Sequence, residues 1–166
     1  VSKYLARSYT EAFLVLHQGH ILTEQYWAGM TPQTPHRLYS VGKSLLANVV
    51  AVLADEGRLR LQAGITDYVH ELGETAYAEA TLRQLLDMQS GVKYEYDLKN
   101  AHNSTTEQGR HFRAAGIFRK LPAEDPAMGQ YEFFLSLDKA SRGHGSVFSY
   151  KCCDTGVLAW VCERVT

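Results

Sequence analysis

The sequence predicts an α+β fold in which helices pack on one antiparallel sheet, and three observations indicate it. Two apolar runs flank Gln18-Gly19, which is typical of a β-hairpin. From Ser40 onward the apolar residues recur at helical spacing, and further helical patterns occupy the second half of the chain. Because the 166 residues match the usual size of one domain, we expect a single domain over residues 1–166.

The hairpin is predicted over residues 12–27, AFLVLHQGHILTEQYW. Gly19 can adopt the positive φ that a tight two-residue turn requires, so the two apolar runs are expected to pair as antiparallel strands. The segment TPQTPHR follows, and Pro32 and Pro35 exclude both a helix and a central strand there. This segment is therefore expected to be an irregular connection.

The longest predicted helix starts at Ser40 and ends before Gly57. It is apolar nearly all round, so we expect it to be buried. Residues 59–68 are typical of a loop and turn. Thr81 is a suitable cap for a short amphipathic helix, TLRQLLDMQSG, which Gly91 is expected to end.

The second half of the chain contains one long irregular stretch and two more helices. Residues 93–129 are polar, and a segment of this length without regular structure is often functional. YEFFLSLDKA, residues 131–140, is expected to be helical, and Gly143 and Gly145 end that pattern. Asp154 is predicted to cap the last helix.

Composition excludes several classes of function. A formal net charge of -1 provides no general attraction to nucleic acid, and no apolar run approaches the roughly 20 residues of a membrane-spanning helix. The first residues lack both the apolar core of a signal peptide and an initiator Met, which is consistent with further residues upstream. Cys152, Cys153 and Cys162 lack a zinc-binding spacing and are expected to be free thiols, which favours the cytoplasm over a periplasmic or secreted location.

The stretch RLYSVGKSLL, residues 37–46, is compatible with two kinds of chemistry. Gly42-Lys43-Ser44 resembles the end of a nucleotide-binding phosphate loop, but that motif requires a glycine five residues before Gly42, where this chain has Arg37. The loop should also follow a buried strand, and TPQTPHR precedes it instead. These two mismatches exclude the phosphate loop.

Ser40 and Lys43 form instead a Ser-x-x-Lys pattern at the start of the long helix. Residues three apart share a helix face, so the amine is expected within reach of the hydroxyl. The helix dipole would favour negative charge at that oxygen, and burial would lower the pKa of Lys43 towards that of a working base. From spacing alone, a plain capping serine beside a solvated lysine is an equally good interpretation.

The same pattern occurs at Ser90/Lys93 and at Ser136/Lys139, so the motif alone is weak. The first of these pairs straddles a predicted helix end at Gly91. The second lies late in an amphipathic helix, where a solvated polar face is the simpler explanation. Only Ser40 and Lys43 open a long apolar helix.

Three segments in order resemble the serine β-lactamase and penicillin-binding-protein superfamily. TPQTPHRLYSVGKSLLANVVAVLADEGRLRLQAGITDYVHEL is similar to its nucleophile region, ATLRQLLDMQSGVKY to its Leu-Leu-x-x-x-Ser-Gly segment, and VFSYKCCDTGVLAWVCERVT to its tyrosine segment. The nearest branch is the class C β-lactamase-like esterases, amidases and 6-aminohexanoate-dimer hydrolases. The resemblance implies the β-lactamase/transpeptidase-like fold.

The resemblance also implies roles for particular residues. Ser40 would be the nucleophile, Lys43 its base partner, and Tyr150 the group that passes a proton to the leaving amine or alcohol. The backbone N–H of Ser40 would form half of an oxyanion hole. Neither a metal nor an organic cofactor is implied.

Substrate-binding positions are less regular. Cys152 stands where the family usually has Asn or Ser, which weakens an expected hydrogen bond to the substrate or the lysine. Tyr94 and Tyr96 follow the Ser-Gly segment, where the family lines its substrate cleft. The alternative for both tyrosines is that they cover the core.

The family's third motif, Lys-Thr-Gly or a relative on an edge strand, has no counterpart before Thr166. A single hairpin is also marginal as a sheet in water. We therefore expect residues 1–166 to be the N-terminal and helical part of the fold with only the first hairpin, completed by C-terminal strands or by a second chain.

The predicted function is hydrolysis of a small-molecule amide or ester through an acyl-enzyme on Ser40, provided that the missing part is supplied. The alternatives are a non-catalytic penicillin-binding or peptidoglycan-sensing module of the same fold, or an inactive fragment. A Gly-x-Ser-x-Gly elbow is absent, since GHGSVF has its glycines in other positions. None of the seven histidines belongs to a His-Glu-x-x-His metal motif.

Overall fold

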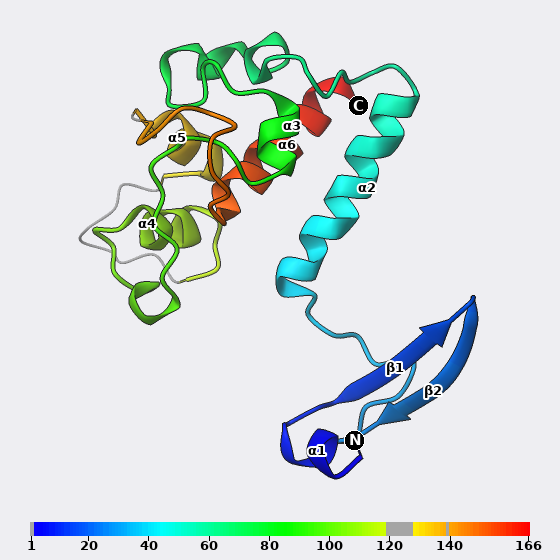
Figure 1. The fold of residues 1–166 in the computed structure, drawn as a ribbon. Coiled ribbons are helices and arrows are strands. Elements are labelled where there is room, and N and C mark those ends of the chain that lie inside the picture. The colour runs from blue at the N-terminus through cyan, green and yellow to red at the C-terminus, as the bar shows by residue number, and fades with distance from the viewer. Residues whose placement is uncertain (1, 119–127, 139) are drawn as a thin grey trace. The chain divides into compact units, whose positions relative to one another are not determined.

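The computed structural model describes residues 2–118, 128–138 and 140–166. Its chain forms two compact units, residues 1–39 and residues 40–166. The helices and strands in chain order are α1 Ser2–Arg7, β1 Ala12–His17, β2 His20–Tyr26, α2 Gly42–Asp55, α3 Leu82–Leu86, α4 Glu107–Ala114, α5 Gln130–Leu135 and α6 Cys152–Val165 (Figure 1).

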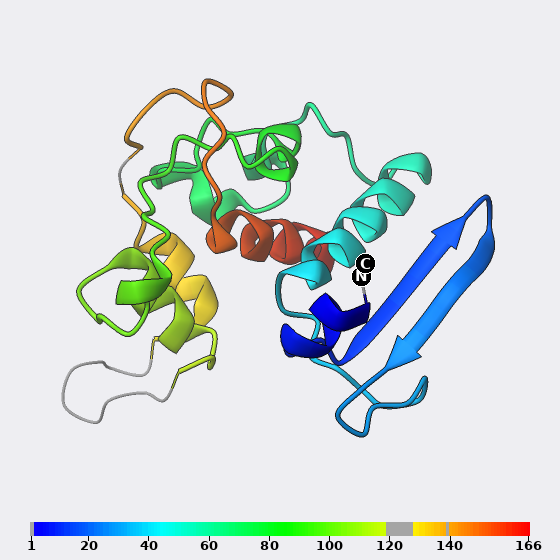
Figure 2. The ribbon, with the colours of Figure 1, turned by 60° about the horizontal axis from the view of Figure 1, so that its bottom comes forward.

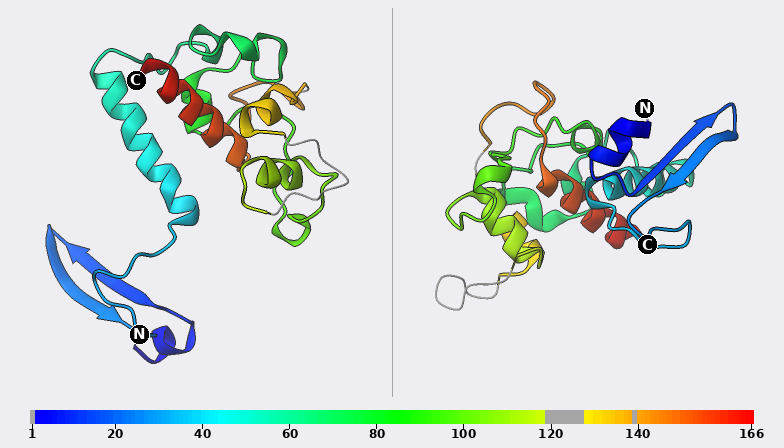
Figure 3. Two further views of the ribbon diagram at one scale, coloured as in Figure 1. Left: turned by 180° about the vertical axis from the view of Figure 1, so that it is seen from behind. Right: turned by 90° about the horizontal axis from the view of Figure 1, so that it is seen from below.

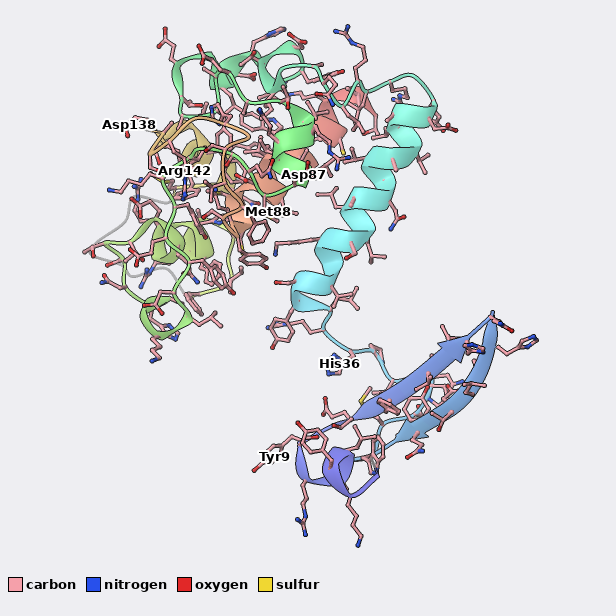
Figure 4. All side chains as sticks on the ribbon, viewed as in Figure 1. Tyr9, His36, Asp87, Met88, Asp138 and Arg142 are labelled. Carbon is pink, nitrogen blue, oxygen red and sulfur yellow. The ribbon has the colours of Figure 1, made fainter. Side chains whose placement is uncertain are left out.

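The first unit contains the predicted hairpin. Strands β1 and β2 pair antiparallel, from Ala12 opposite Tyr26 to His17 opposite His20. Gln18 and Gly19 both have positive φ, 49° and 79°, which is the two-residue turn that matches the twist of a hairpin. In the same unit the ring of His36, which is labelled in Figure 4, hydrogen-bonds the carboxylate of Glu11. The predicted hairpin is confirmed.

The second unit is helical, and α6 lies at its centre. α6 contacts both α2 and α3, and views from opposite sides place it beside α2 (Figures 1 and 3). Helices α4 and α5 pack against each other (Figure 2). The core includes Val157 and Val161 of α6 and Leu82 and Leu85 of α3, all without solvent exposure.

Helix α2 begins and ends as predicted, with Gly57 at φ 73° just after its last turn. The prediction that it is buried is wrong for the described residues. Val50 is 1% exposed, but Leu45, Val49 and Val52 are 57%, 46% and 56% exposed. α6 covers one side of α2, and no described segment of the second unit covers the other.

Two of the smaller helices are shorter than predicted. Thr81 caps α3, because its side chain accepts a hydrogen bond from the N–H of Gln84, whose side chain in turn accepts one from the N–H of Thr81. α3 ends at Leu86 rather than at Gly91, since Met88 takes a positive φ of 54°. α5, residues 130–135, starts one residue before the predicted helix 131–140 and ends five residues before its predicted end.

The other two differences concern α4 and α6. Residues 93–129 are not wholly irregular, because α4 starts after Thr106, whose hydroxyl accepts a hydrogen bond from the N–H of Gly109. Asp154 does not cap α6. It lies in the first turn, fully buried, and its carboxylate accepts hydrogen bonds from the hydroxyl of Ser90.

Among the described residues, no helix combines the length and the apolar character that crossing a membrane requires.

Candidate active site

The hydroxyl of Ser40 lies at the entry to α2, in a 3-10 turn spanning Tyr39–Val41. The first residue of this turn, Tyr39, is strained, because its φ of 46° lies in a region that few non-glycine residues adopt. Lys43 lies one helical turn further on, and its Nζ donates a hydrogen bond of 3.2 Å to Ser40 Oγ. The i,i+3 spacing thus brings the amine to the hydroxyl, as the sequence predicted.

Tyr150, which lies just before α6 near the end of the chain, contacts the same Ser40 oxygen. Its hydroxyl lies 2.6 Å from Ser40 Oγ, a short hydrogen bond between residues 110 positions apart. Tyr150 directly precedes Lys151, the N-cap of α6, and α6 packs on α2. The Lys43 amine also lies 5.1 Å from the centre of the Tyr150 ring. Packing of α2 on α6 therefore brings the three predicted proton-handling groups together.

The prediction that burial would leave Lys43 with a lowered pKa is wrong. Burial does lower it, but the hydrogen bond to Tyr150 and the ionisable groups of Cys152 and Tyr150 together outweigh burial and raise the pKa of Lys43 above its ordinary value. Lys43 is therefore an ammonium at neutral pH in this arrangement. It donates to Ser40, which leaves the Ser40 proton free to point towards Tyr150.

Tyr94 and Tyr96 line a pocket of about 460 Å³ next to Tyr150. The other lining residues are Lys93, Glu95, Ser141, Arg142 and Ser149, and Figure 4 marks Arg142 in the loop before α6. The ring of Tyr96 meets that of Tyr150 edge-on, with centroids 4.8 Å apart. Ser40 and Lys43 are not among the lining residues, so Tyr150 is the residue that connects the pocket with Ser40.

The two pocket tyrosines are held differently. Burial raises the pKa of Tyr94 well above its ordinary value, and its hydroxyl hydrogen-bonds Nδ1 of His111 at 3.2 Å. His111 is itself buried and stacked on Phe133, and burial lowers the pKa of His111 to about 4. Tyr94 is thus a fixed wall of the pocket, and His111 is a supporting residue that sequence reasoning missed. No local motif marks His111, since its partners are distant in the chain.

Cys152 is half-buried and free, at the first residue of α6. Its thiol hydrogen-bonds the Lys43 amine and, when ionised, attracts it, and both effects contribute to the raised pKa of Lys43. The three cysteines are all free thiols, as predicted. Cys152 therefore lies at the site, beside the lysine rather than beside the serine.

The other two Ser-x-x-Lys pairs do not form such a site. Ser90 is buried, with its hydroxyl bonded to Asp154, whereas Lys93 lies at the pocket rim and forms an ion pair of 4.0 Å with Glu107. Ser136 accepts a hydrogen bond from Arg110, and Lys139 lies outside the described residues.

Within the described ranges, no group of three or more His, Cys, Asp or Glu side chains could hold a metal ion.

The chain is 41% identical over 164 residues to the 6-aminohexanoate-dimer hydrolase of Paenarthrobacter ureafaciens, covering 98% of this chain and 40% of that protein. The solved structure of a putative 6-aminohexanoate-dimer hydrolase from Bacillus anthracis matches with a TM-score of 0.85 and 31% identity, over 100% of this chain and 42% of that one.

A putative β-lactamase from Bacteroides dorei has the same fold, with a TM-score of 0.69 and 20% identity over 99% of this chain and 44% of that one. The chain thus spans about two fifths of the length of the relatives that it matches. The predicted fold, in its N-terminal part, is confirmed by these matches. The sequence profile of the beta-lactamase family matches residues 5–166, and the chain belongs to that family.

Proposed function

We propose that the polypeptide carrying this chain is a serine hydrolase that cleaves an amide or ester bond through an acyl-enzyme on Ser40. The observation that carries the proposal is the hydroxyl of Ser40, which is hydrogen-bonded at 2.6 Å to Tyr150 and at 3.2 Å to Lys43. A serine hydroxyl is a weak nucleophile unless a neighbouring group can accept its proton. Tyr150 is positioned to accept it, and Lys43 supplies a positive charge beside both oxygens. Membership in the beta-lactamase family supports the same chemistry.

In the first half-reaction Ser40 Oγ attacks the carbonyl carbon of the substrate while the Ser40 proton moves to Tyr150, which reacts as the phenolate beside the Lys43 ammonium. The C–N or C–O bond then breaks, and Tyr150 gives the proton to the departing amine or alcohol. In the second half-reaction a water molecule attacks the acyl-enzyme and loses its proton to Tyr150, and Ser40 regains its proton as the acid product leaves. No metal or cofactor takes part.

Lys43 acts in this scheme as an ammonium rather than as the first proton acceptor. Its raised pKa and its donated hydrogen bond to Ser40 favour Tyr150 as the immediate acceptor. Positive charge at Lys43 stabilises the phenolate of Tyr150 before it accepts the proton and again after it gives the proton to the leaving group. This assignment refines the role of base partner that the sequence suggested.

The substrate is proposed to enter the pocket beside Tyr150. Tyr94 forms a fixed wall, Tyr96 lies edge-on to the catalytic phenol, and Cys152 replaces the more usual amide or hydroxyl group beside Lys43. A relative at 41% identity is named for hydrolysis of 6-aminohexanoate dimer, a short linear amide. A linear amide or ester of that size is therefore the first substrate class to test.

We further propose that residues 1–166 are the N-terminal and helical part of one β-lactamase-like domain. The exposed apolar face of α2 supports this view, as do Leu14 and Leu16 of β1, which are 45% and 62% exposed. Large apolar faces of this kind usually mark a surface that another element covers. Further strands from the same polypeptide, or from a second chain, would cover them and donate the second N–H of the oxyanion hole beside that of Ser40.

A fluorescent phosphonate and a fluorescent penicillin test the nucleophile in the full polypeptide. We expect rapid labelling by the phosphonate that Ser40→Ala abolishes, while Ser136→Ala, the matched serine of another Ser-x-x-Lys pair, leaves it unchanged. Labelling with turnover of a chromogenic ester indicates a hydrolase, whereas a stable penicillin adduct without turnover indicates a penicillin-binding module. Ester turnover that survives Ser40→Ala would refute the proposal.

A further inference from the structure

The backbone around Tyr150 is held on both sides by the segment that follows α3. Before Tyr150, the N–H of Ser149 donates a hydrogen bond of 2.8 Å to the carbonyl of Met88, a residue with positive φ that Figure 4 marks just after α3. After Tyr150, the Lys151 ammonium donates to the carbonyl of Ser90 at 2.7 Å and to that of Ser149 at 3.2 Å. The Tyr150 backbone is therefore fixed at its two neighbours.

The same segment is tied to α6 through a buried carboxylate. Ser90 Oγ lies 2.7 Å and 2.8 Å from the two carboxylate oxygens of Asp154, and the hydroxyl of Tyr77 donates to one of them at 3.1 Å. Ser90, Lys151, Asp154 and Tyr77 all have no solvent exposure. Ser90 thus connects the cation of Lys151, through its carbonyl, with the anion of Asp154, through its hydroxyl.

Apolar side chains would hold α6 on α3 equally well. Lysine and aspartate are almost never fully buried unless they are paired, and replacing buried charges with apolar residues is often neutral or stabilising. Burial lowers the pKa of Lys151 and raises that of Asp154, so the surroundings of both groups disfavour their charged forms. The polar groups differ from apolar ones in that their hydrogen bonds are directional. Each bond fixes the position of one donor relative to one acceptor.

We propose that Lys151, Ser90 and Asp154 are positioning residues whose hydrogen bonds hold the Tyr150 phenol at the Ser40 hydroxyl. This inference rests on the proposed function, because it concerns the group that we assign to proton transfer. The Tyr150 and Ser40 oxygens are 2.6 Å apart, so a small displacement of the Tyr150 side chain would break this hydrogen bond. A displacement of about 1 Å in a reacting group can reduce the rate about 100-fold.

The test compares Lys151→Met with Arg113→Met in the full polypeptide. Arg113 is the matched control, because it is also buried and donates to two backbone carbonyls, those of Gly109 and His102, but it does not contact Tyr150. Each variant is assayed with one acyl group carried as a p-nitrophenyl ester and as a methyl ester. The nitrophenolate leaves without a proton, whereas the alkoxide needs one from Tyr150.

We expect Lys151→Met to lower kcat/KM, which reports acylation, for both esters, because Tyr150 also accepts the Ser40 proton. The loss should be on the order of 10-fold for the p-nitrophenyl ester and on the order of 100-fold for the methyl ester, whose leaving group needs a proton as well. Arg113→Met should change both rates by the same factor, since a merely structural loss affects both substrates alike. Lys151→Arg, which keeps the cation and its donors, should restore most of the difference. Equal losses on the two esters for Lys151→Met would overturn the inference.

Ser90→Ala provides the second variant if Lys151→Met does not fold. It removes the hydroxyl bonded to Asp154 and keeps the carbonyl that Lys151 binds. We expect the same preferential loss on the methyl ester, and an unchanged ratio of the two rates would again overturn the inference. Failure of the proposed function is distinct, because in that case Ser40→Ala would retain hydrolysis of both esters.

Discussion

At the start of α2, Ser40 is exposed, Lys43 is half-buried, and their hydrogen bond joins residues three positions apart. At the start of α6, Lys151 and Asp154 are buried, and their partner Ser90 is more than 60 positions away. The arrangement of Ser40 and Lys43 therefore follows from the local geometry of one helix, on a side that faces solvent. The tyrosine side depends on tertiary contacts, so its geometry should be more sensitive to changes far from the reacting atoms.

The largest expected effect is on the α2 side. Lys43→Met removes the donor to Ser40 Oγ and the positive charge beside Tyr150, and we expect kcat for the ester to fall on the order of 10³-fold with little loss of stability. Steady-state kinetics and thermal unfolding check it. Lys99→Met, at an exposed lysine, is the control, and a loss below 10-fold at Lys43 would show that the amine is dispensable.

The next effect is on the α6 side and concerns Gly91, one residue after Ser90. A Cβ on Gly91 would lie 1.9 Å from the carbonyl oxygen of Arg142, so the backbone before α6 would have to move. We expect Gly91→Ala to lower the free energy of unfolding by about 3 kcal/mol. Gly73→Ala, with open space at its Cβ, should lower it by less than about 1 kcal/mol in the same urea titration.

Asp154 gives the α6 side a pH dependence of stability. Burial raises the pKa of Asp154 to about 6, although Ser90 and Lys151 act against it. The folded state therefore binds more protons than the unfolded state between pH 4 and 6, so this group makes stability fall as pH rises through that window. The loss is about 3 kcal/mol, at about 1.4 kcal/mol per pH unit.

His111 acts in the opposite direction over nearly the same range. Its pKa is lowered to about 4, so the unfolded state binds more protons between pH 4 and 6.5, and stability rises with pH there. In the Asp154→Asn variant we expect the free energy of unfolding to rise with pH over this range. In the His111→Gln variant we expect it to fall with pH. Denaturant unfolding at pH 4, 5 and 6 checks both, and parallel curves for the two variants would contradict the assignment.

The smallest expected effect compares the two faces of α2 in the 166-residue chain. Val50→Ala, at 1% exposure, should cost about 2 kcal/mol of stability. Val49→Ala, at 46% exposure, should stay within about 0.5 kcal/mol. If further strands cover α2 in the longer polypeptide, Val49→Ala should become clearly destabilising there. An equally small effect in both chains would leave that face of α2 without a covering element.

Much of the fold follows from local pattern. The Gln18-Gly19 turn, the limits of α2 and the cap at Thr81 depend on residues within a few positions of one another, and each was predicted correctly. The end of α3 and the existence of α4 were not predicted correctly. Met88 adopts its positive φ where its carbonyl accepts from Ser149, and the cap at Thr106 was hidden in a polar stretch.

The sequence by itself determined the pairing of Ser40 with Lys43, because two residues three apart in a helix share a face wherever that helix lies. It also identified Tyr150 and the free cysteines, the tyrosine through its resemblance to a family segment. Only the tertiary structure decided that Lys43 has a raised pKa, that α2 exposes one apolar face, and that Asp154 bonds Ser90 instead of capping α6. These properties depend on which distant groups surround a side chain, and the spacing of residues along a chain does not specify that.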